Sequence, residues 1–250
     1  MKDVSAVVLA AGKGSRLKGN KPKVLKILGG QPIIIRILKL LDKLKIQNRI
    51  LVLGHRSNTI LDKLLKSNYK ENILIQKEPQ GTAHSLQFVI RLISTKEVLV
   101  LYGDDSGLYR PQTIKNFVKY HINSGNKATF MVSKVNQKTD IGGILLDKKG
   151  YVMTVVTRSQ MEEHDINQIR NLCGAFCFNS QWISKNISNI PKSEISGEYP
   201  LPGIIKIANS QEVKIGSYLL PDQNEWNSLN TNKELIEARK KMKKKLQIKK

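Results

Sequence analysis

The sequence predicts an α/β fold in which a mostly parallel sheet is covered on both faces by helices. Short apolar runs have the length and composition of buried strands, and they occur at 4–9, 50–53, 73–75, 98–101, 128–132 and 173–178. Helical patterns alternate with them at 32–44, 57–66, 82–93 and 111–123. With 250 residues, the chain is long enough to bury the core of one large domain.

Two prolines mark expected helix starts. Pro32 and Pro111 each open a helical pattern, and the fixed φ of proline suits a first helical turn. The region from about 133 to 220 contains shorter strands and less helix. We therefore expect a second, smaller half inserted into the main scaffold.

A glycine-rich, cationic loop follows the first apolar run. Gly12 and Gly14 lack a Cβ, so the backbone can turn tightly and bring its N–H groups close to an anion. Three positively charged side chains accompany this turn, namely Lys13, Arg16 and Lys23. The combination favours a nucleoside triphosphate site, and the alternative for this loop alone is a basic turn without a ligand.

The spacing excludes two better-known phosphate loops. A dinucleotide-binding loop needs a third glycine where Leu17 stands, and an acid closing the second strand, where Leu53, Gly54 and His55 occur. A P-loop needs four residues between its first glycine and the Gly-Lys-Ser/Thr triplet, which residues 12–15 do not supply.

Two further strand ends carry candidate ligand-binding groups. Gln76 follows the run at 73–75, and its amide offers a donor and an acceptor, as a pyrimidine edge requires. Asp104 follows the run at 98–101 at the sheet edge where α/β folds bind ligands, and magnesium prefers such carboxylates. A polar strand end and a helix-capping aspartate are the structural alternatives.

Four blocks in one order resemble the uridylyltransferases that make UDP-N-acetylglucosamine, within the sugar-1-phosphate nucleotidyltransferases. The blocks are LAAGKGSRL, NKPKVL, QKEPQGTAHS and VLVLYGD, and the likeness runs from Val4 to about Leu235. It implies a Rossmann-like, three-layer nucleotidyltransferase fold with a mixed, mostly parallel sheet. The implied domain spans 1–230, with a nucleotide-binding half to about 132, a sugar-binding half from about 133, and a basic tail at 231–250.

The resemblance also implies roles for individual residues. Nucleotide contacts are implied for Leu9, Ala11, Gly12, Gly14, Gln76, Gly81 and Thr82, with Gln76 and Gly81 on uracil. Catalytic roles are implied for Arg16, Lys23 and Asp104, and Mg²⁺ ligation for Asp104 and Asn230. Asn230 could instead cap the final helix, and His84 either touches the ligand or orients its loop.

The implied sugar site departs from the family pattern. Its candidates are Tyr102, Gly143, Thr157, Arg158 and Asn171. Relatives place a Glu where Thr157 stands and an Asn where Leu172 stands, so the acceptor stays open. Asn171 could replace that Asn only by a one-residue shift, which would turn its side chain to the other sheet face. Asp105 replaces an apolar residue and is expected to be solvated.

The implied reaction joins UTP and N-acetylglucosamine 1-phosphate by Mg²⁺-dependent, in-line attack on the α-phosphate. Two alternatives remain, a nucleotidyltransferase acting on another sugar or alcohol phosphate or another NTP, and a non-catalytic nucleotide-binding relative. The sequence contains no hexapeptide repeat, so acetyl transfer is not expected.

Composition bounds the location and the partners. The net charge of +22 is mostly diffuse lysine, concentrated only from Arg239 to Lys250, so a solvated helix is favoured over a phosphate-rich partner or an anionic membrane. Nucleic acid is an unexpected partner because aromatics are sparse.

Cys173 and Cys177 lie about 13 Å apart on one expected strand, too far to pair. Buried thiols and the lack of a leader or a spanning segment indicate a cytoplasmic protein.

Overall fold

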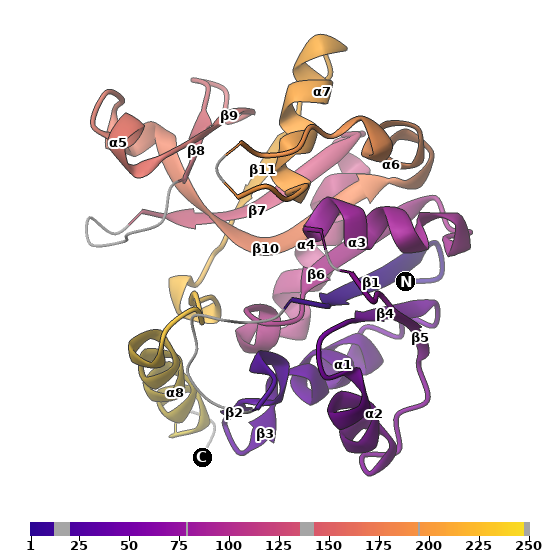
Figure 1. The fold of residues 1–250 in the computed structure, drawn as a ribbon. Coiled ribbons are helices and arrows are strands. Elements are labelled where there is room, and N and C mark those ends of the chain that lie inside the picture. Colours follow the sequence, from indigo (N-terminus) through magenta and orange to yellow (C-terminus); the bar gives the residue numbers. More distant parts are fainter. Residues whose placement is uncertain (13–20, 79, 136–142, 195, 248–250) are drawn as a thin grey trace.

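The structure is a computed structural model that describes residues 1–12, 21–78, 80–135, 143–194 and 196–247 (Figure 1). Its main sheet has the strand order β11-β7-β10-β6-β1-β4-β5, with β8 paired to β10 and β9 paired to β8. The strands are β1 (Val4–Ala10), β4 (Arg49–Leu53), β5 (Asn72–Ile75), β6 (Glu97–Tyr102), β7 (Ala128–Lys134), β8 (Gly143–Leu146), β9 (Val152–Val156), β10 (Ile169–Asn179) and β11 (Gly216–Leu219). A separate hairpin joins β2 (Ile27–Leu28) and β3 (Gln31–Pro32).

Helices cover both faces of the sheet. They are α1 (Ile33–Lys43), α2 (Ser57–Leu65), α3 (Thr82–Val89), α4 (Pro111–Asn123), α5 (Arg158–Met161), α6 (Ser180–Asn186), α7 (Ile204–Ser210) and α8 (Asn232–Gln247). Apolar side chains of α1, α2, α4 and α8 share one buried cluster with one face of the sheet. Those of α3, α6 and α7 share a second cluster with the other face. The expected three-layer α/β architecture is confirmed.

Strand direction creates the edge that matters for function. β1 is parallel to β4 and β6, and β4 is parallel to β5, so the carboxyl ends of these four strands meet at one edge of the sheet. β10 runs antiparallel to both β6 and β7, which makes the sheet mixed. The segments that follow β1, β4, β5 and β6 are therefore neighbours in space although they are far apart in the sequence.

Several expected boundaries shift in the structure. Pro111 occupies the first turn of α4 as expected, but Pro32 precedes α1 because its backbone pairs with Ile27 in the β2–β3 hairpin. The expected helix at 82–93 ends at Val89 and continues as a 3-10 turn. The expected strand at 173–178 begins four residues earlier and contains a bulge between Leu172 and Phe176.

Both cysteines are free and buried on β10, as expected. Burial raises the pKa of each thiol well above its usual value, so both remain protonated and poorly reactive at neutral pH. Of the helices in the described ranges, none is long and apolar enough to cross a membrane.

Phe176 lies at the centre of an aromatic group in the second core cluster, and its removal tests that core. It is fully buried and packs against Phe130, Phe178 and Tyr102. We expect Phe176→Ala to lower the free energy of unfolding by about 3–5 kcal/mol, because it leaves a cavity among stiff side chains. Urea denaturation measures this, and Phe88→Ala at a half-exposed position should change it by no more than about 0.5 kcal/mol.

Candidate active site

The carboxyl edge of the parallel strands brings three backbone segments into close contact. Gly103 N donates to Leu9 O at 2.8 Å, which fixes the end of β6 against the end of β1. At Gly54, an added Cβ would lie 2.5 Å from Ala11 O, so only glycine allows this approach after β4. The first loop therefore leaves the sheet between the ends of β4 and β6.

Lys23 joins two oxygen ligands from distant parts of the chain at this edge. Its Nζ donates to Asp104 Oδ2 at 2.6 Å and to Asn230 Oδ1 at 2.9 Å. The Lys23 side chain is 8% exposed, whereas the Asp104 side chain is 39% exposed and faces the open side of the group. The Lys23 ammonium is thus held by protein atoms, while the Asp104 carboxylate stays accessible to a ligand.

Helix α8 holds the segment that carries Asn230. Met242 packs so closely over Gly29 that a Cβ there would lie 2.5 Å from Met242 Cγ, and Arg239 Nε donates to Ile27 O at 3.1 Å. These contacts fix α8 on the β2–β3 hairpin, which follows Lys23 in the chain (Figure 1). The basic C-terminal helix is therefore packed along its apolar face rather than fully solvated.

The alternative that Asn230 caps this helix is wrong. Thr231 N donates to Glu234 Oε2 at 2.7 Å, and Glu234 N donates to Thr231 Oγ1 at 3.2 Å, so the capping box belongs to Thr231. Asn230 Nδ2 donates to Ser228 Oγ at 2.7 Å, which turns its carbonyl oxygen toward Lys23. Asp104 does not cap the 3-10 turn at Ser106–Leu108 either, since Asp105 is its N-cap residue and the turn has no side-chain capping bond.

The oxygen pair has the chemistry of a magnesium site. Asp104 Oδ2 and Asn230 Oδ1 both contact one ammonium, so both oxygens border the same space. A carboxylate and an amide oxygen are hard ligands, and magnesium commonly takes few protein ligands and completes its shell with phosphate oxygens and water.

Asp105 is not simply solvated, contrary to the expectation. Its carboxyl group lies against Gly174, where a Cβ would be 2.2 Å from Oδ1, and it accepts a hydrogen bond from Trp226 Nε1 at 3.3 Å. Burial, followed by the charge of Asp104, raises its pKa well above the usual value. Gly174 has a φ of +62° within the β10 bulge, so this bulge makes room for the second acid.

Gln76 is nearly fully buried, and its amide is engaged within the protein. Ser85 Oγ donates to Gln76 Oε1 at 2.7 Å, and Gln76 Nε2 donates to His84 Nδ1 at 2.6 Å. His84 therefore orients the Gln76 amide, a role that differs from the two predicted for it. One N–H of Nε2 remains to meet a ligand, and the acceptor oxygen of the amide is shared with Ser85.

The turn at Gly81 and Thr82 links the two halves of the chain. Gly81 has a φ of +110°, and a Cβ there would lie 2.5 Å from Tyr199 O. Thr82 Oγ1 accepts from Tyr102 Oη at 3.2 Å and from Leu201 N at 2.8 Å. Burial raises the pKa of Tyr102, so its hydroxyl stays protonated and donates. Three predicted residues of the first half, Gly81, Thr82 and Tyr102, therefore meet here, and Tyr199 and Leu201 of the second half contact them.

The remaining sugar candidates lie on β8, on β10 and after the end of β9, where Gly143 pairs with Val156 and Ile144 pairs with Arg170. Thr157 caps α5 through a capping box with Gln160, and Gly143 is needed because a Cβ would lie 2.7 Å from Arg170 O. Asn171 is buried and donates to Lys134 O at 3.2 Å, on the sheet face opposite Leu172. The alternation of strand side chains separates it from Tyr102, as expected for a one-residue shift, and a sugar contact of Asn171 stays a prediction.

Part of the predicted site cannot be located. Gly14, Arg16 and the neighbouring Lys13 lie outside the described residues, as does the side chain of Arg158. Leu9 and Ala11 are buried at the sheet edge, where only their backbone is available to a ligand, and Gly12 is exposed beside them.

The sequence analysis missed three residues that shape the site. Tyr199 braces the Gly81 turn through its backbone, Trp226 bonds Asp105, and Gly174 makes room for that carboxyl. The Glu-Tyr pair at 198–199 and the segment around Trp226 were visible in the sequence, but their partners lie more than 100 residues away. A glycine within an apolar strand was the one signal of the bulge.

Comparison with known proteins defines the family. The family model described as nucleotidyl transferase matches residues 5–245, so the chain belongs to this family. It is 28% identical over 243 residues to the bifunctional protein GlmU of Clostridioides difficile and 29% identical over 244 residues to that of Oceanobacillus iheyensis. Each alignment covers 96% of this chain and 52% of the relative, so the chain spans about half the length of these curated relatives.

Solved structures confirm the fold. A putative glucose-1-phosphate thymidylyltransferase from Bacillus anthracis, in complex with a sucrose, superposes with a TM-score of 0.77 at 16% identity, covering 95% of this chain and 94% of that one. HddC from Yersinia pseudotuberculosis superposes with a TM-score of 0.72 at 19% identity, covering 96% and 99%. At these identities the likeness establishes the fold.

Asp105 provides a test of the site's electrostatics. Because folding raises its pKa, the folded state binds a proton that the unfolded state releases above about pH 4, so this carboxyl destabilises the fold increasingly as the pH rises. We expect Asp105→Asn to raise Tm in metal-free buffer, by an amount that grows between pH 4 and pH 8. Thermal denaturation at several pH values measures this.

The control for that experiment is Asp3→Asn, which changes an exposed acid at the start of the chain. Its effect on Tm should stay small at every pH. A Tm for Asp105→Asn that lies below the unsubstituted protein throughout this range would show that the negative charge stabilises the site.

Proposed function

We propose that the chain is a nucleotidyltransferase that joins UTP and N-acetylglucosamine 1-phosphate to give UDP-N-acetylglucosamine and pyrophosphate. The observation that carries the proposal is the convergence of Asp104 and Asn230 on Lys23 at the carboxyl edge of the parallel strands. Membership of the nucleotidyl transferase family supports the reaction class. The resemblance of the four sequence blocks to uridylyltransferases supports the choice of UTP and of this sugar.

The nucleotide would lie along the edge formed by the ends of β1, β5 and β6. The backbone at Ala11 and Gly12 would face the phosphates, where N–H groups stabilise anions without side-chain bulk. The remaining N–H of Gln76 and the backbone at Gly81 would face the uracil ring, because His84 and Ser85 fix the amide in one orientation. Such fixed donors and acceptors favour one base over another.

The chemistry requires positioning and charge neutralisation. A phosphate oxygen of the sugar phosphate attacks the α-phosphorus and forms a new P–O bond, while the bond to the β-phosphate oxygen breaks and pyrophosphate leaves with its electron pair. The attacking oxygen is already anionic, so no general base is needed. Lys23 would neutralise charge that develops on the phosphates, and its contacts with Asp104 and Asn230 hold it in place beforehand.

Magnesium is the proposed cofactor, with Asp104 and Asn230 as its protein ligands. When bound, it would supply Lewis-acid polarisation of phosphate oxygens and a fixed positive charge. Release of Asp104 from Lys23 would then free the ammonium for the phosphates.

A second candidate is the same reaction with another sugar 1-phosphate. Thr157 is committed to capping α5, and Leu172 packs against the second core cluster, so neither supplies the polar contacts that relatives place at these positions. Tyr102 and the Gly81–Thr82 turn remain as the acceptor-side groups braced by Tyr199. The lack of these polar contacts at Thr157 and Leu172 favours an acceptor pocket whose hydrogen bonds to the sugar differ from those of the relatives.

Asp104→Ala should lower kcat/KM by at least about 100-fold, because it removes the carboxylate of the metal pair. The measurement is pyrophosphate release with magnesium present, and an unchanged circular dichroism spectrum and Tm would show that the fold is intact. Asp62→Ala, at an exposed acid on α2, is the matched control and should leave activity unchanged. Magnesium-dependent turnover that survives Asp104→Ala would refute the metal assignment.

A panel of nucleoside triphosphates against sugar 1-phosphates, with and without magnesium, tests the substrates. We expect turnover to be fastest with UTP and N-acetylglucosamine 1-phosphate, since the Gln76 amide matches a pyrimidine edge. Faster turnover with glucose 1-phosphate would select the second candidate, and faster turnover with dTTP would refute UTP as the preferred nucleotide. Nucleotide binding without pyrophosphate release from any pair would show a non-catalytic relative.

A further inference from the structure

A second groove lies at the opposite end of the parallel strands from the proposed active site. It has a volume of 820 Å³ and runs between α1, the hairpin turn before it, and the segment that links α2 to β5. Arg49 begins β4 and Glu71 immediately precedes β5, so the groove opens at the amino ends of these parallel strands. The proposed active site lies at their carboxyl ends, roughly 15 Å further along β4.

The groove carries an excess of positive charge. Four cationic and two anionic residues line it, namely Lys39, Lys63, Lys70, Arg49, Asp42 and Glu71. Arg49 already pairs with both acids, and Tyr69 Oη donates to Asp42 Oδ2 at 2.9 Å. Among the described residues, the three lysines have no ion-pair partner. Their charge is therefore available to an anion.

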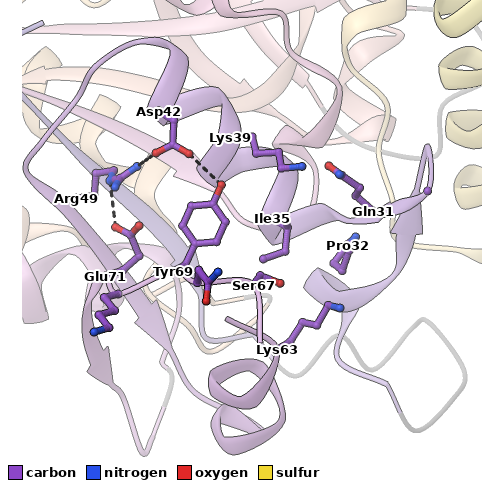
Figure 2. Close-up of a pocket in the computed structure, with 13 residues that line it drawn as sticks. Gln31, Pro32, Ile35, Lys39, Asp42, Arg49, Lys63, Ser67, Tyr69 and Glu71 are labelled. Carbon is purple, nitrogen blue, oxygen red and sulfur yellow. Dashed lines mark hydrogen bonds and ion pairs between the residues drawn. The ribbon is translucent and has the colours of Figure 1, made fainter. Parts of the chain in front are cut away.

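Cationic side chains line the groove from more than one side. Figure 2 shows Lys39 next to Gln31, with Ile35 and Pro32 between these two residues and Lys63 in the view. Lys63 is half-buried, which lowers the competition from solvent and reduces the entropy lost when it holds a ligand. Two ammonium groups lining one groove suit a phosphate, which accepts hydrogen bonds on several oxygens.

Polar groups around the hollow indicate the rest of the ligand. Gln31 and Ser67 offer an amide and a hydroxyl, and Figure 2 shows the Ser67 hydroxyl on the same side as Lys63. Both groups accept and donate hydrogen bonds, as the hydroxyl groups of a polyol require.

We propose that this groove is a second ligand site, which binds a sugar phosphate or a similarly phosphorylated polyol. The phosphate lies between Lys39 and Lys63, and the hydroxyl groups bond to Gln31 and Ser67. Ile35, Pro32 and the ring of Tyr69 provide the apolar surface that sugar rings pack against. The proposal does not depend on the proposed reaction, because it uses different residues at the other end of the strands.

The test is a titration of the whole chain with glucose 6-phosphate, followed by protein-observed NMR. We expect the amide signals of Gln31, Ser67 and Tyr69 to shift along the titration, and those of Gly103 and Asp104 to stay in place. Shifts confined to the latter two would place the ligand in the proposed active site and overturn the second site.

Two matched double variants separate the groove from general surface charge. Lys39→Gln with Lys63→Gln should weaken glucose 6-phosphate binding by about tenfold or more for each lysine removed, as measured by calorimetry. Lys43→Gln with Lys66→Gln removes the same charge from exposed positions on or next to the same helices and should leave affinity within about twofold. Equal weakening by both pairs would refute a defined site.

Inorganic phosphate and sorbitol serve as partial ligands in the same experiment. We expect both to bind more weakly than glucose 6-phosphate, since each satisfies one half of the groove. Inorganic phosphate binding as tightly as glucose 6-phosphate would reduce the groove to a simple anion site and overturn the assignment of the polyol. Unchanged Tm values for the double variants show that any loss of binding is local.

Discussion

The contact of the Lys23 ammonium with Asp104 and Asn230 is the interaction on which the functional part of this structure depends. It joins a segment after the first strand, the end of β6 and the start of the C-terminal helix. By themselves, the oxygens of Asp104 and Asn230 would repel a phosphate. They are held around the Lys23 ammonium, whose positive charge attracts a phosphate. The tight glycine contacts at the sheet edge and the docking of α8 serve to keep these three segments together.

The link between the two halves of the chain is as important as the cation group. Gly81 approaches Tyr199 so closely that no side chain fits, and Thr82 bonds both Tyr102 and Leu201. Gly81 is proposed to face the base, and Tyr102 is proposed to face the acceptor. Both are therefore held by contacts of the Gly81–Thr82 turn with residues 199–201. A change in either would be transmitted to the other, because packed interiors deform little before they rearrange.

The positive charge of this protein has distinguishable environments. One lysine is held by oxygens at the carboxyl edge of the sheet, and others line the groove at the amino edge without ion-pair partners among the described residues. On α8, Lys241 donates to Trp226 O at 3.0 Å, and burial lowers the pKa of this lysine. A net charge counted from composition treats all of these as equivalent, although their surroundings give them different roles.

The sequence by itself determined six of the described strands, the helices α1 to α4 and the family, and it singled out Lys23, Asp104 and Asn230, because apolar periodicity and linear motifs are local properties. Only the tertiary structure decided that Asn171 and Leu172 lie on opposite faces of β10, that Thr157 caps a helix, and that a bulge at Gly174 accommodates Asp105. It also revealed the second groove. These features arise from contacts between residues far apart in the chain, and strand register, side-chain direction and burial are set only when those segments pack together.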